Sequence, residues 1–244
     1  MAWRHWYYPP ASVAGLVLGC TLWASTAGAN APPSANLASP ARPIPTAAML
    51  NPKRADFLGK LPSPDARQVA DWVMSSGDNA TLPFVIVDKI GARVFVFDGT
   101  GHLRGSSMAL LGLAHGDDSI PGIGTRKLAL IRPEERTTPA GRFVAMLGRD
   151  IHQDILWVDY ETAISLHRVV MGNPGDHRHQ RLLGNSPLNK RISYGCINVP
   201  AKFFDTVVLK VFSGTNGIVY ILPEQRRLRD VFPIPAPAPD EKHR

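Results

Sequence analysis

The sequence has very few cysteines: its 244 residues contain two, Cys20 and Cys196. We expect Cys20 to be removed with an N-terminal segment, which would leave Cys196 as the only thiol. A single thiol excludes an internal disulfide, and the chain lacks any compact pair of cysteine or histidine ligands of the zinc-finger kind. Because an unpaired cysteine in an oxidising compartment is prone to oxidation, chemistry is one explanation for its presence.

A long apolar stretch, residues 11–29, follows a short opening segment that carries Arg4. It ends in small residues that are typical of a cleavage site, which predicts a signal peptide over residues 1–29. Two alternatives stay open. The stretch ending at Cys20 loosely resembles a lipobox, and about 19 apolar residues approach the length of a membrane anchor. Each alternative places the chain in the periplasm or cell envelope, with a membrane partner only for a lipidated Cys20 or an uncleaved anchor.

Acidic residues are fewer than basic ones, 20 against 27, and the formal net charge is +7. The basic residues are scattered and no helix carries a basic stripe, so the pattern does not indicate a nucleic-acid partner. An anionic cell-wall polymer or membrane surface would suit the charge, and so would a basic secreted protein with no charged partner. The length between the flanking segments predicts one domain, and the chain has no internal repeat.

Two segments poor in periodic apolar residues flank this domain. Residues 30–64 are rich in Pro, Ala and Ser, which predicts an extended linker. Residues 65–77 are predicted to form a short helix, because Ser63 suits the N-cap and Pro64 the first turn. The chain turns basic and then Pro-Ala rich after this domain, so we expect residues 223–244 to form an exposed tail.

Strand signals dominate residues 82–222, the expected catalytic domain. β-branched and aromatic runs separated by Gly, Pro or Asp predict strands. The predicted strands are residues 84–88, 93–98, 128–131, 143–147, 155–159, 162–169 and 217–222, with a hairpin turn at 89–92. In the second half, only residues 200–212 are predicted to be helical. The expected fold class is therefore mainly β, a sandwich or partly open barrel with a few short helices.

Cys196 lies in the segment Ser-Tyr-Gly-Cys-Ile-Asn, residues 193–198. A cysteine attacks as its thiolate, and an ordinary thiol has a pKa of about 8.5, so a nucleophilic one needs a nearby base or cation. Gly195 lets the backbone turn sharply and bring the sulfur and amide N–H groups to one point, where they could form an oxyanion hole. The alternative is a buried structural cysteine, because free cysteines are among the most buried residues.

Three histidines upstream are candidates for the base: His167, His177 and His179. In residues 162–169, apolar side chains alternate with small ones, so His167 projects from a face whose other side chains are small. His177 and His179 fall in a polar segment that we expect to be a solvated loop. We therefore assign the base to His167. A metal site built from Cys196 and these histidines is an alternative with little support from the spacing.

The segment at residues 193–198, with His167 on a strand upstream, resembles the active-site signature of the L,D-transpeptidase (YkuD-type) family. Residues 138–143, Thr-Pro-Ala-Gly-Arg-Phe, are similar to a second stretch found in that family, and the hairpin at residues 85–101 resembles its opening strands. The resemblance covers about residues 82–222 and is fairly specific, because two motifs occur in the family's order.

This resemblance implies a β-sandwich-like domain that acts on the stem peptides of peptidoglycan, with no cofactor and no metal. By position, Cys196 would be the nucleophile and His167 the general base. The backbone amides of Gly195 and Cys196 would line the oxyanion site, while Ser193 and Asn198 would shape the turn. In the family, the acyl group passes from the stem peptide through a thioester, with release of the terminal D-alanine.

Two further residues have alternative roles, Arg191 beside the motif and Tyr194 within it. Arg191 would either meet a substrate carboxylate or form an exposed salt bridge. Tyr194 stands where the family commonly has histidine, and its hydroxyl could replace only part of that role. An inserted loop at about residues 170–190 lengthens the spacing, so His177 fits the common interval better by count. We keep His167, because a base needs a rigid strand position more than a fixed interval.

Three functions stay open at this point. The leading one is a peptidoglycan L,D-transpeptidase that passes the acyl group to an amine. A hydrolytic version, an L,D-carboxypeptidase or amidase, would use water instead. A module that binds peptidoglycan but has lost turnover is the third, with Tyr194 as the sign of that loss.

Overall fold

The computed structural model describes residues 53–150 and 152–236, which all lie in one compact unit. The predicted signal peptide, Cys20 and residues 30–52 of the predicted linker lie outside the described residues. No helix within the two described ranges is long and apolar enough to cross a membrane.

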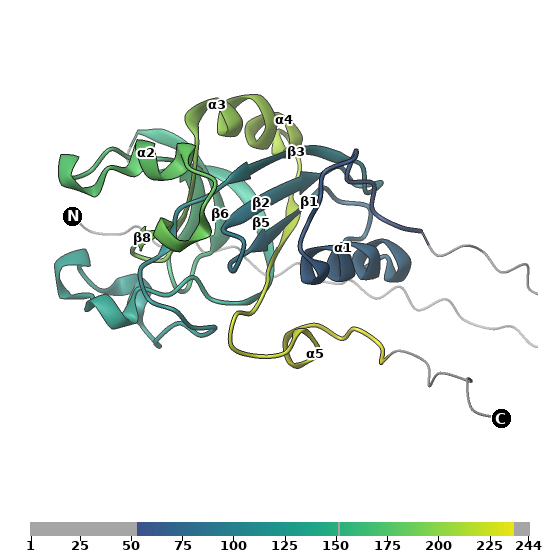
Figure 1. The fold of residues 1–244 in the computed structure, drawn as a ribbon, viewed down its shortest axis with the longest axis horizontal. Coiled ribbons are helices and arrows are strands. Elements are labelled where there is room, and N and C mark those ends of the chain that lie inside the picture. Colours follow the sequence, from purple (N-terminus) through teal and green to yellow (C-terminus); the bar gives the residue numbers. More distant parts are fainter. Residues whose placement is uncertain (1–52, 151, 237–244) are drawn as a thin grey trace, which may run out of the picture. The chain divides into compact units, whose positions relative to one another are not determined.

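The described part of the chain contains ten strands, and eight of them form one sheet (Figure 1). The order across this sheet is β3-β2-β1-β10-β5-β6-β7-β9. Its strands are β1 (Phe84–Asp88), β2 (Arg93–Phe97), β3 (Leu103–Met108), β5 (Gly141–Asp150), β6 (Gln153–Asp159), β7 (Ile164–Arg168), β9 (Ile197–Val199) and β10 (Gly217–Ile221). A second sheet joins β4 (Leu111–Gly112) to β8 (Arg191–Ser193). The expected fold class, mainly β with a few short helices, is confirmed.

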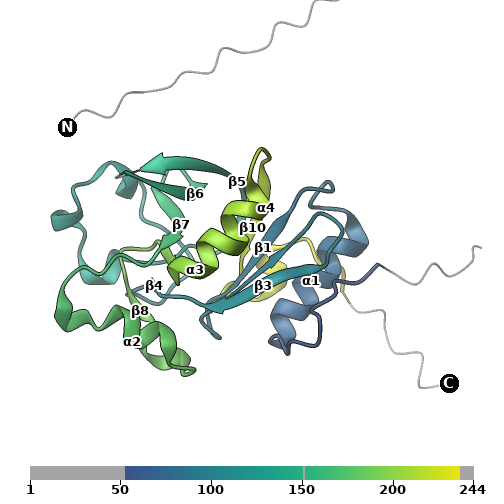
Figure 2. The ribbon, with the colours of Figure 1, turned by 90° about the horizontal axis from the view of Figure 1, so that it is seen from above.

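Short helices pack around this sheet (Figures 1 and 2). The α-helices are α1 (Pro64–Ser76), α2 (Arg178–Leu183), α3 (Ala201–Phe203), α4 (Leu209–Phe212) and α5 (Leu228–Val231), and a π-helical turn (Phe204–Val208) joins α3 to α4. Five 3-10 turns lie in the loops, at Ile123–Thr125, Leu128–Leu130, Pro133–Glu135, Pro174–Asp176 and Pro187–Asn189.

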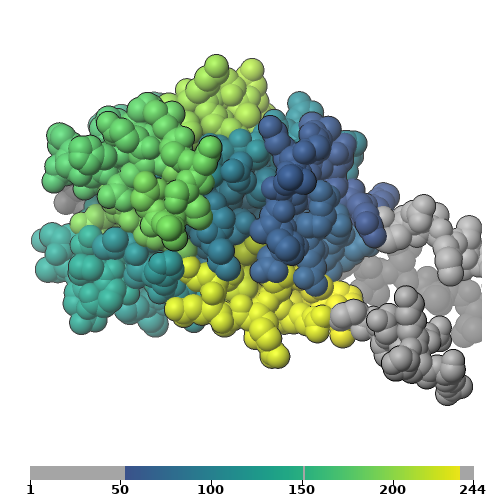
Figure 3. All heavy atoms as spheres, in the orientation of Figure 1, coloured from purple at the N-terminus to yellow at the C-terminus, as the bar shows by residue number. Residues whose placement is uncertain are grey.

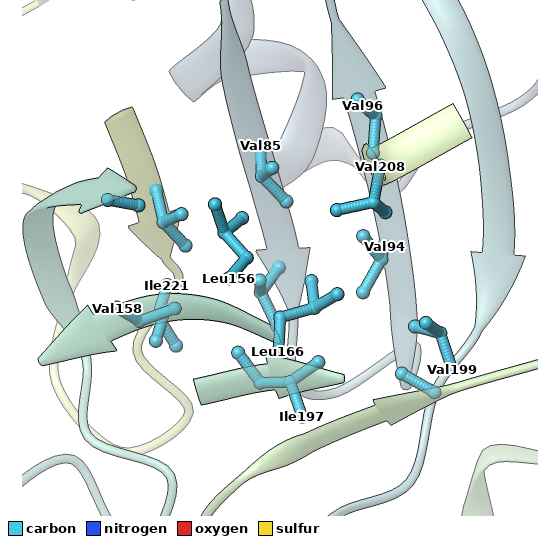
Figure 4. Close-up of a cluster of buried hydrophobic side chains, with 14 of the residues drawn as sticks. Val85, Val94, Val96, Leu156, Val158, Leu166, Ile197, Val199, Val208 and Ile221 are labelled. Atoms are coloured by element: carbon cyan, nitrogen blue, oxygen red, sulfur yellow. The ribbon is translucent and has the colours of Figure 1, made fainter. Parts of the chain in front are cut away.

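Two hydrophobic cores lie on opposite faces of the sheet. Because side chains alternate along a strand, Val85 and Val87 of β1 enter the first core, while Phe84 and Ile86 enter the second. The first core, shown in Figure 4, combines both halves of the sheet with α3 and α4. The second lies under α1 and contains Trp72 of that helix. Strand β1 is thus buried on both faces, which explains its unbroken apolar run.

The helical segment from α3 to α4 bridges the two ends of the open sheet. At the β3 end, a Cβ atom on Gly105 would lie 3.0 Å from Val207 and 3.1 Å from Phe203, so the helix packs directly on this strand. At the other end, the guanidinium of Arg168 in β7 lies 4.5 Å from the centre of the Phe204 ring. The sheet is therefore a partly open barrel whose gap is filled by a helix.

Several predicted elements are present. The helix predicted at residues 65–77 is α1, where Ser63 accepts a hydrogen bond from the Ala66 amide at 3.2 Å and Gly77 ends the helix at φ +71°. The predicted strands at 84–88, 93–98, 143–147, 155–159, 162–169 and 217–222 correspond to β1, β2, β5, β6, β7 and β10. The predicted helix at 200–212 corresponds to the segment from α3 to α4.

Three expectations are wrong. Residues 128–131 form a 3-10 turn rather than a strand, with Leu128 and Leu130 exposed, because no neighbouring strand pairs with them. The linker was expected to extend to residue 64, but Phe57 is buried in the second core. The tail from residue 223 is not exposed throughout, since Phe232 packs against Trp72 and Tyr220.

A buried lysine ties the hairpin turn to two other segments. The Lys89 ammonium donates to the Asp117 carboxylate at 2.8 Å and to the carbonyls of Gly116 and Thr138 at 2.6 and 3.0 Å. Asp117 in turn accepts hydrogen bonds from the backbone amides of residues 224–226 at 2.7 to 3.0 Å. A buried charge is costly unless it is paired, and here both ions are fully hydrogen-bonded.

We expect Asp117→Asn to destabilise the fold in a pH-dependent way. Burial raises the pKa of Asp117, but the hydrogen bonds from Lys89 and the backbone amides outweigh it and lower the pKa to about 2. This folded-state value lies below the ordinary value of about 3.9, so the carboxylate stabilises the fold above about pH 4, and this contribution is lost as the pH falls toward 2.

Thermal unfolding of wild type and Asp117→Asn between pH 7 and pH 2 checks this. The difference in Tm should be constant above about pH 4 and shrink below it. Asp118→Asn is the matched control, because the Asp118 side chain is 81% exposed and should change stability by less than about 0.5 kcal/mol. A Tm difference that does not change with pH would contradict the assignment.

Candidate functional site

The segment with Cys196 is a tight loop between β8 and β9. Strand β9 pairs in parallel with β7, and the register places His167 opposite Asn198 and Leu166 opposite Ile197. Cys196 directly precedes Ile197, so the pairing brings the thiol and the imidazole together. The segment between the two strands has no influence on this register, because it only connects them.

Three groups of β7 and the turn before it surround the sulfur atom. The His167 imidazole is near enough to the Cys196 thiol to lower the pKa of that thiol. The Ser165 hydroxyl lies 3.7 Å from Sγ, and the Ala163 carbonyl oxygen also lies 3.7 Å from it. Ala163 has a φ of +56°, a left-handed conformation that costs a non-glycine residue about 1 kcal/mol or more. Local strain thus accompanies the placement of a carbonyl beside the thiol.

The histidine ring is held in a defined orientation. Nδ1 of His167 lies 2.7 Å from the Arg168 carbonyl oxygen, to which it can only donate a proton. Nε2 is therefore the nitrogen that remains for the thiol. The Asn198 side-chain amide lies 3.4 Å from the same Nε2 and donates to the Cys196 carbonyl at 3.2 Å. Asn198 thus spans the loop and the base.

The electrostatics of the pair favour a charge-separated state. Burial alone raises the pKa of the Cys196 thiol, but the hydrogen bond and positive charge of His167 outweigh this effect and lower the pKa below its ordinary value. Burial alone lowers the pKa of His167, while its hydrogen bond and the charge of Cys196 raise the pKa above the ordinary value. Each group thus stabilises the charged form of the other, as a thiolate nucleophile requires.

Ser193 and Gly195 fix the shape of the loop. The Ser193 hydroxyl donates to the Cys196 carbonyl at 2.6 Å and accepts from the Gly195 amide at 3.1 Å. Gly195 has a φ of +127°, and a Cβ atom there would lie 2.7 Å from Ile164 and from the Thr137 carbonyl oxygen. Only glycine fits this position. Ser193 and Asn198 thus both form hydrogen bonds within the turn.

The second motif supports the loop from behind. The buried Thr138 hydroxyl donates to the Gly195 carbonyl at 2.7 Å and accepts from the Gly112 amide at 2.8 Å. The Thr138 carbonyl accepts from Lys89 at 3.0 Å. Sequence reasoning identified Thr138 only as part of a motif, and this structural role follows from the tertiary contacts.

Arg191 lies away from the thiol, in the buried ion cluster. Its guanidinium forms a salt bridge with Glu224 at 2.5 Å and donates to the Lys89 carbonyl at 3.2 Å, and its side chain is 11% exposed. The expected contact with a substrate carboxylate or an exposed partner is therefore replaced by a buried salt bridge. The buried glutamate from the predicted tail is a partner that the local sequence pattern did not reveal.

Tyr194 lies beside the thiol in the wall of a small pocket. The guanidinium of Arg136 lies 3.9 Å from the centre of the Tyr194 ring, a cation–π contact. Arg136 also donates to the Ile131 carbonyl through Nε and Nη2, at 3.2 and 3.0 Å. Tyr194 is thus fixed to the loop between β4 and β5.

The inserted segment at residues 170–190 carries the other two candidate histidines. His177 and His179 are both exposed, and among the described residues it is His167, not either of these, that interacts with Cys196. The expected polar loop instead contains α2, whose Arg178 guanidinium donates to the side-chain Oδ1 of Asn198 at 3.4 Å. In Figure 3 this segment and the loop between β4 and β5 form two neighbouring surfaces at one end of the molecule.

The pocket beside the thiol has a volume of about 70 Å³ and is formed mainly by the loop between β4 and β5. Cys196, Tyr194 and Ala163 contribute to its wall. No group of three or more potential metal ligands occurs among the described residues. The site therefore presents a thiol, a base and an adjoining pocket.

Comparison with known proteins gives limited information. No family model and no curated protein sequence matches the chain. Among solved structures, the helical cell shape determining protein Pgp2 from Campylobacter jejuni is 14% identical, with a TM-score of 0.39, over 59% of this chain and 49% of that chain. An L,D-transpeptidase from Xylanimonas cellulosilytica is also 14% identical, with a TM-score of 0.35, over 57% of this chain and 60% of that chain.

The chain thus spans about half to three-fifths of the length of these two neighbours. The likeness concerns the course of the backbone only. We base the function on the geometry of the site itself.

We expect the Cys196 thiol to react with iodoacetamide at a pH below that of an ordinary thiol. In a Cys20→Ser background, the alkylation rate should titrate with an inflection below about 8.5. His167→Ala should raise the inflection, because the thiolate loses its charged partner. His177→Ala is the control and should leave it unchanged, since His177 is exposed. The opposite pattern for the two histidine variants would refute the pairing.

We expect Thr138→Val to destabilise the loop that carries Cys196. The valine has nearly the same shape but leaves the Gly112 amide and the Gly195 carbonyl without partners, at a cost of about 1 to 3 kcal/mol for each group. Thr138→Ser keeps the hydroxyl and should retain most of the stability. Chemical denaturation measures both variants. Equal losses for valine and serine would show that the methyl group, and not the hydrogen bonds, is what matters.

Proposed function

We propose that this chain is a cysteine-dependent L,D-transpeptidase that transfers an acyl group from a peptidoglycan stem peptide. The observation that carries the proposal is the Cys196–His167 pair, in which the histidine is oriented by a backbone carbonyl and the thiol has a lowered pKa. The resemblance of residues 193–198 and 138–143 to the two family motifs supports the same class. The proposed location is the periplasm or cell envelope, where this substrate occurs.

The first half of the reaction forms a thioester. Nε2 of His167 holds the proton of the Cys196 thiol, and the thiolate attacks the carbonyl of the diamino acid residue that precedes the terminal D-alanine. The bond between this carbonyl carbon and the D-alanine nitrogen breaks. His167 returns the proton to that nitrogen, and D-alanine leaves as the free amino acid.

The second half transfers the acyl group. An acceptor amine attacks the thioester carbonyl and gives a proton to His167, the carbon–sulfur bond breaks, and the thiolate of Cys196 is restored. When water attacks instead of an amine, the same steps give a tripeptide and the enzyme is a carboxypeptidase. The acceptor therefore decides between transferase and hydrolase, while the roles of Cys196 and His167 are the same.

Of the two backbone amides expected at the oxyanion site, one is already hydrogen-bonded within the loop. The Gly195 amide donates to Ser193 within the loop, so it is already used in the structure. We therefore assign the Cys196 amide as the main donor to the oxyanion. One such donor contributes about 3 to 4 kcal/mol of transition-state stabilisation in well-studied acyl transfer enzymes.

The alternative of an inactive binding module rests on Tyr194. This residue lies in the pocket wall and is packed under Arg136, next to an oriented thiol–imidazole pair. A module that only binds peptide has no need to lower the pKa of a thiol. The geometry therefore favours the enzyme over the module.

The test is incubation of the chain with a muropeptide that carries a tetrapeptide stem, followed by mass spectrometry over time. Wild type should release D-alanine and give a thioester, then a cross-linked dimer or a tripeptide. Cys196→Ala should be inactive, and His167→Ala should lose at least about 100-fold, the usual contribution of a general base. His177→Ala should retain activity. Binding of the muropeptide by wild type without any change in mass would instead support the binding module.

A further inference from the structure

The pocket beside Cys196 has a chemically asymmetric wall. Five aliphatic side chains line it, together with hydroxyl groups, the Cys196 thiol and one basic residue, Arg126. The aliphatic residues are Ile123, Leu128, Ile131, Ala163 and Ile164. No carboxylate is among the lining residues. A ligand group that fits such a wall has an aliphatic part and one negative charge.

Arg126 uses only part of its hydrogen-bonding capacity. Its Nη1 atom donates to the two carboxylate oxygens of Glu135 at 3.1 and 3.2 Å. Its Nε and Nη2 atoms have no hydrogen-bond partner within residues 53–150 and 152–236. The side chain is 31% exposed, so these donors are partly shielded from water. The free part of the guanidinium can bind a second carboxylate.

The Glu135 carboxylate does not interact with Arg126 alone, because Arg132 also donates hydrogen bonds to it. Nη2 of Arg132 lies 3.3 Å from the Glu135 carboxylate, and the Arg132 backbone amide donates to the same carboxylate at 2.9 Å. Two guanidinium groups therefore share the Glu135 carboxylate, and Arg132 also pairs with Glu134 at 3.3 Å. These four side chains together carry no net charge, but among them only Arg126 lines the pocket, so the charge that a ligand meets in the pocket wall is positive.

We propose that Arg126 binds a carboxylate of the acyl-donor peptide and so selects donors with a free carboxylate near the scissile carbonyl. This inference rests on the proposed function for the identity of the donor. Two carboxylates of a tetrapeptide stem lie close to that carbonyl: the side-chain carboxylate of a diamino dicarboxylic acid and the carboxylate of the terminal D-alanine. Both present the same chemistry to the arginine.

The experiment measures binding to Cys196→Ala protein by calorimetry, so that no turnover is needed. The ligands are a free tetrapeptide with a diamino dicarboxylic acid, the same peptide amidated on that side chain, and the same peptide amidated at its C-terminus. One amidation should weaken binding about 10- to 100-fold, the range for a hydrogen bond to a charged group. The amide that weakens binding identifies which carboxylate Arg126 holds.

Arg126→Gln is then added to the Cys196→Ala protein. This double variant should bind the unmodified peptide about as weakly as Cys196→Ala binds the amidated peptide whose affinity is reduced. It should also bind the unmodified and the amidated peptide equally well. Arg126→Lys, which keeps the charge, should retain part of the discrimination. Independent, additive losses from Arg126→Gln and from the amidation would overturn the proposal, as would unchanged affinity in Arg126→Gln.

Arg132→Gln is the matched control, because Arg132 shares Glu135 with Arg126 but does not line the pocket. It should weaken binding much less than Arg126→Gln does. An equal loss in this variant would show that the effect is transmitted through Glu135 and would refute a direct contact. If binding depends on the carboxylate but wild type releases no D-alanine, the proposed function is refuted and the proposed binding site is retained. Turnover that is insensitive to both amidation and Arg126→Gln would refute this inference alone.

Discussion

The buried side chain of Thr138 is the contact on which the geometry of the site depends. Its hydroxyl joins the Gly112 amide to the Gly195 carbonyl, and its own carbonyl accepts a hydrogen bond from Lys89. One residue thereby connects β4, the loop with Cys196 and the first hairpin turn. Because each of these polar groups is buried, none can exchange its partner for water without a cost. The position of the Cys196 thiol therefore depends on the contacts of Thr138 as well as on the hydrogen bonds within the loop that carries Cys196.

Strand pairing accounts for the position of the base. A parallel connection needs a crossover segment, and its length does not alter the register of the strands that it joins. His167 therefore lies opposite Asn198 although the intervening segment is longer than is common in the resembled family. His177, nearer in sequence, is exposed at the start of α2. The strand pairing thus places His167 beside the loop with Cys196, although counting residues favours His177.

The sequence predicted the elements whose signal is local. β-branched runs such as residues 84–88 and the cap at Ser63 depend on neighbours a few positions away, and both predictions are correct. Residues 128–131 have the composition of a strand, but a strand also needs a partner, which no local pattern reveals. The sequence left the partner of Arg191 open for a related reason, since Glu224 lies 33 positions away, in a segment expected to be an exposed tail. Long-range ion pairs can be found only in the folded chain.

In the proposed reaction, catalysis and substrate selection would be carried by different parts of the fold. The parallel strands β7 and β9 hold the thiol and its base, and their register leaves little room for variation. The loop between β4 and β5 supplies most of the pocket, and it is joined to the motif through Arg136 on Tyr194. Substitutions in this loop can change the charge and shape of the pocket without moving Cys196 or His167. We therefore interpret Tyr194 as part of the pocket wall and not as a sign of lost turnover.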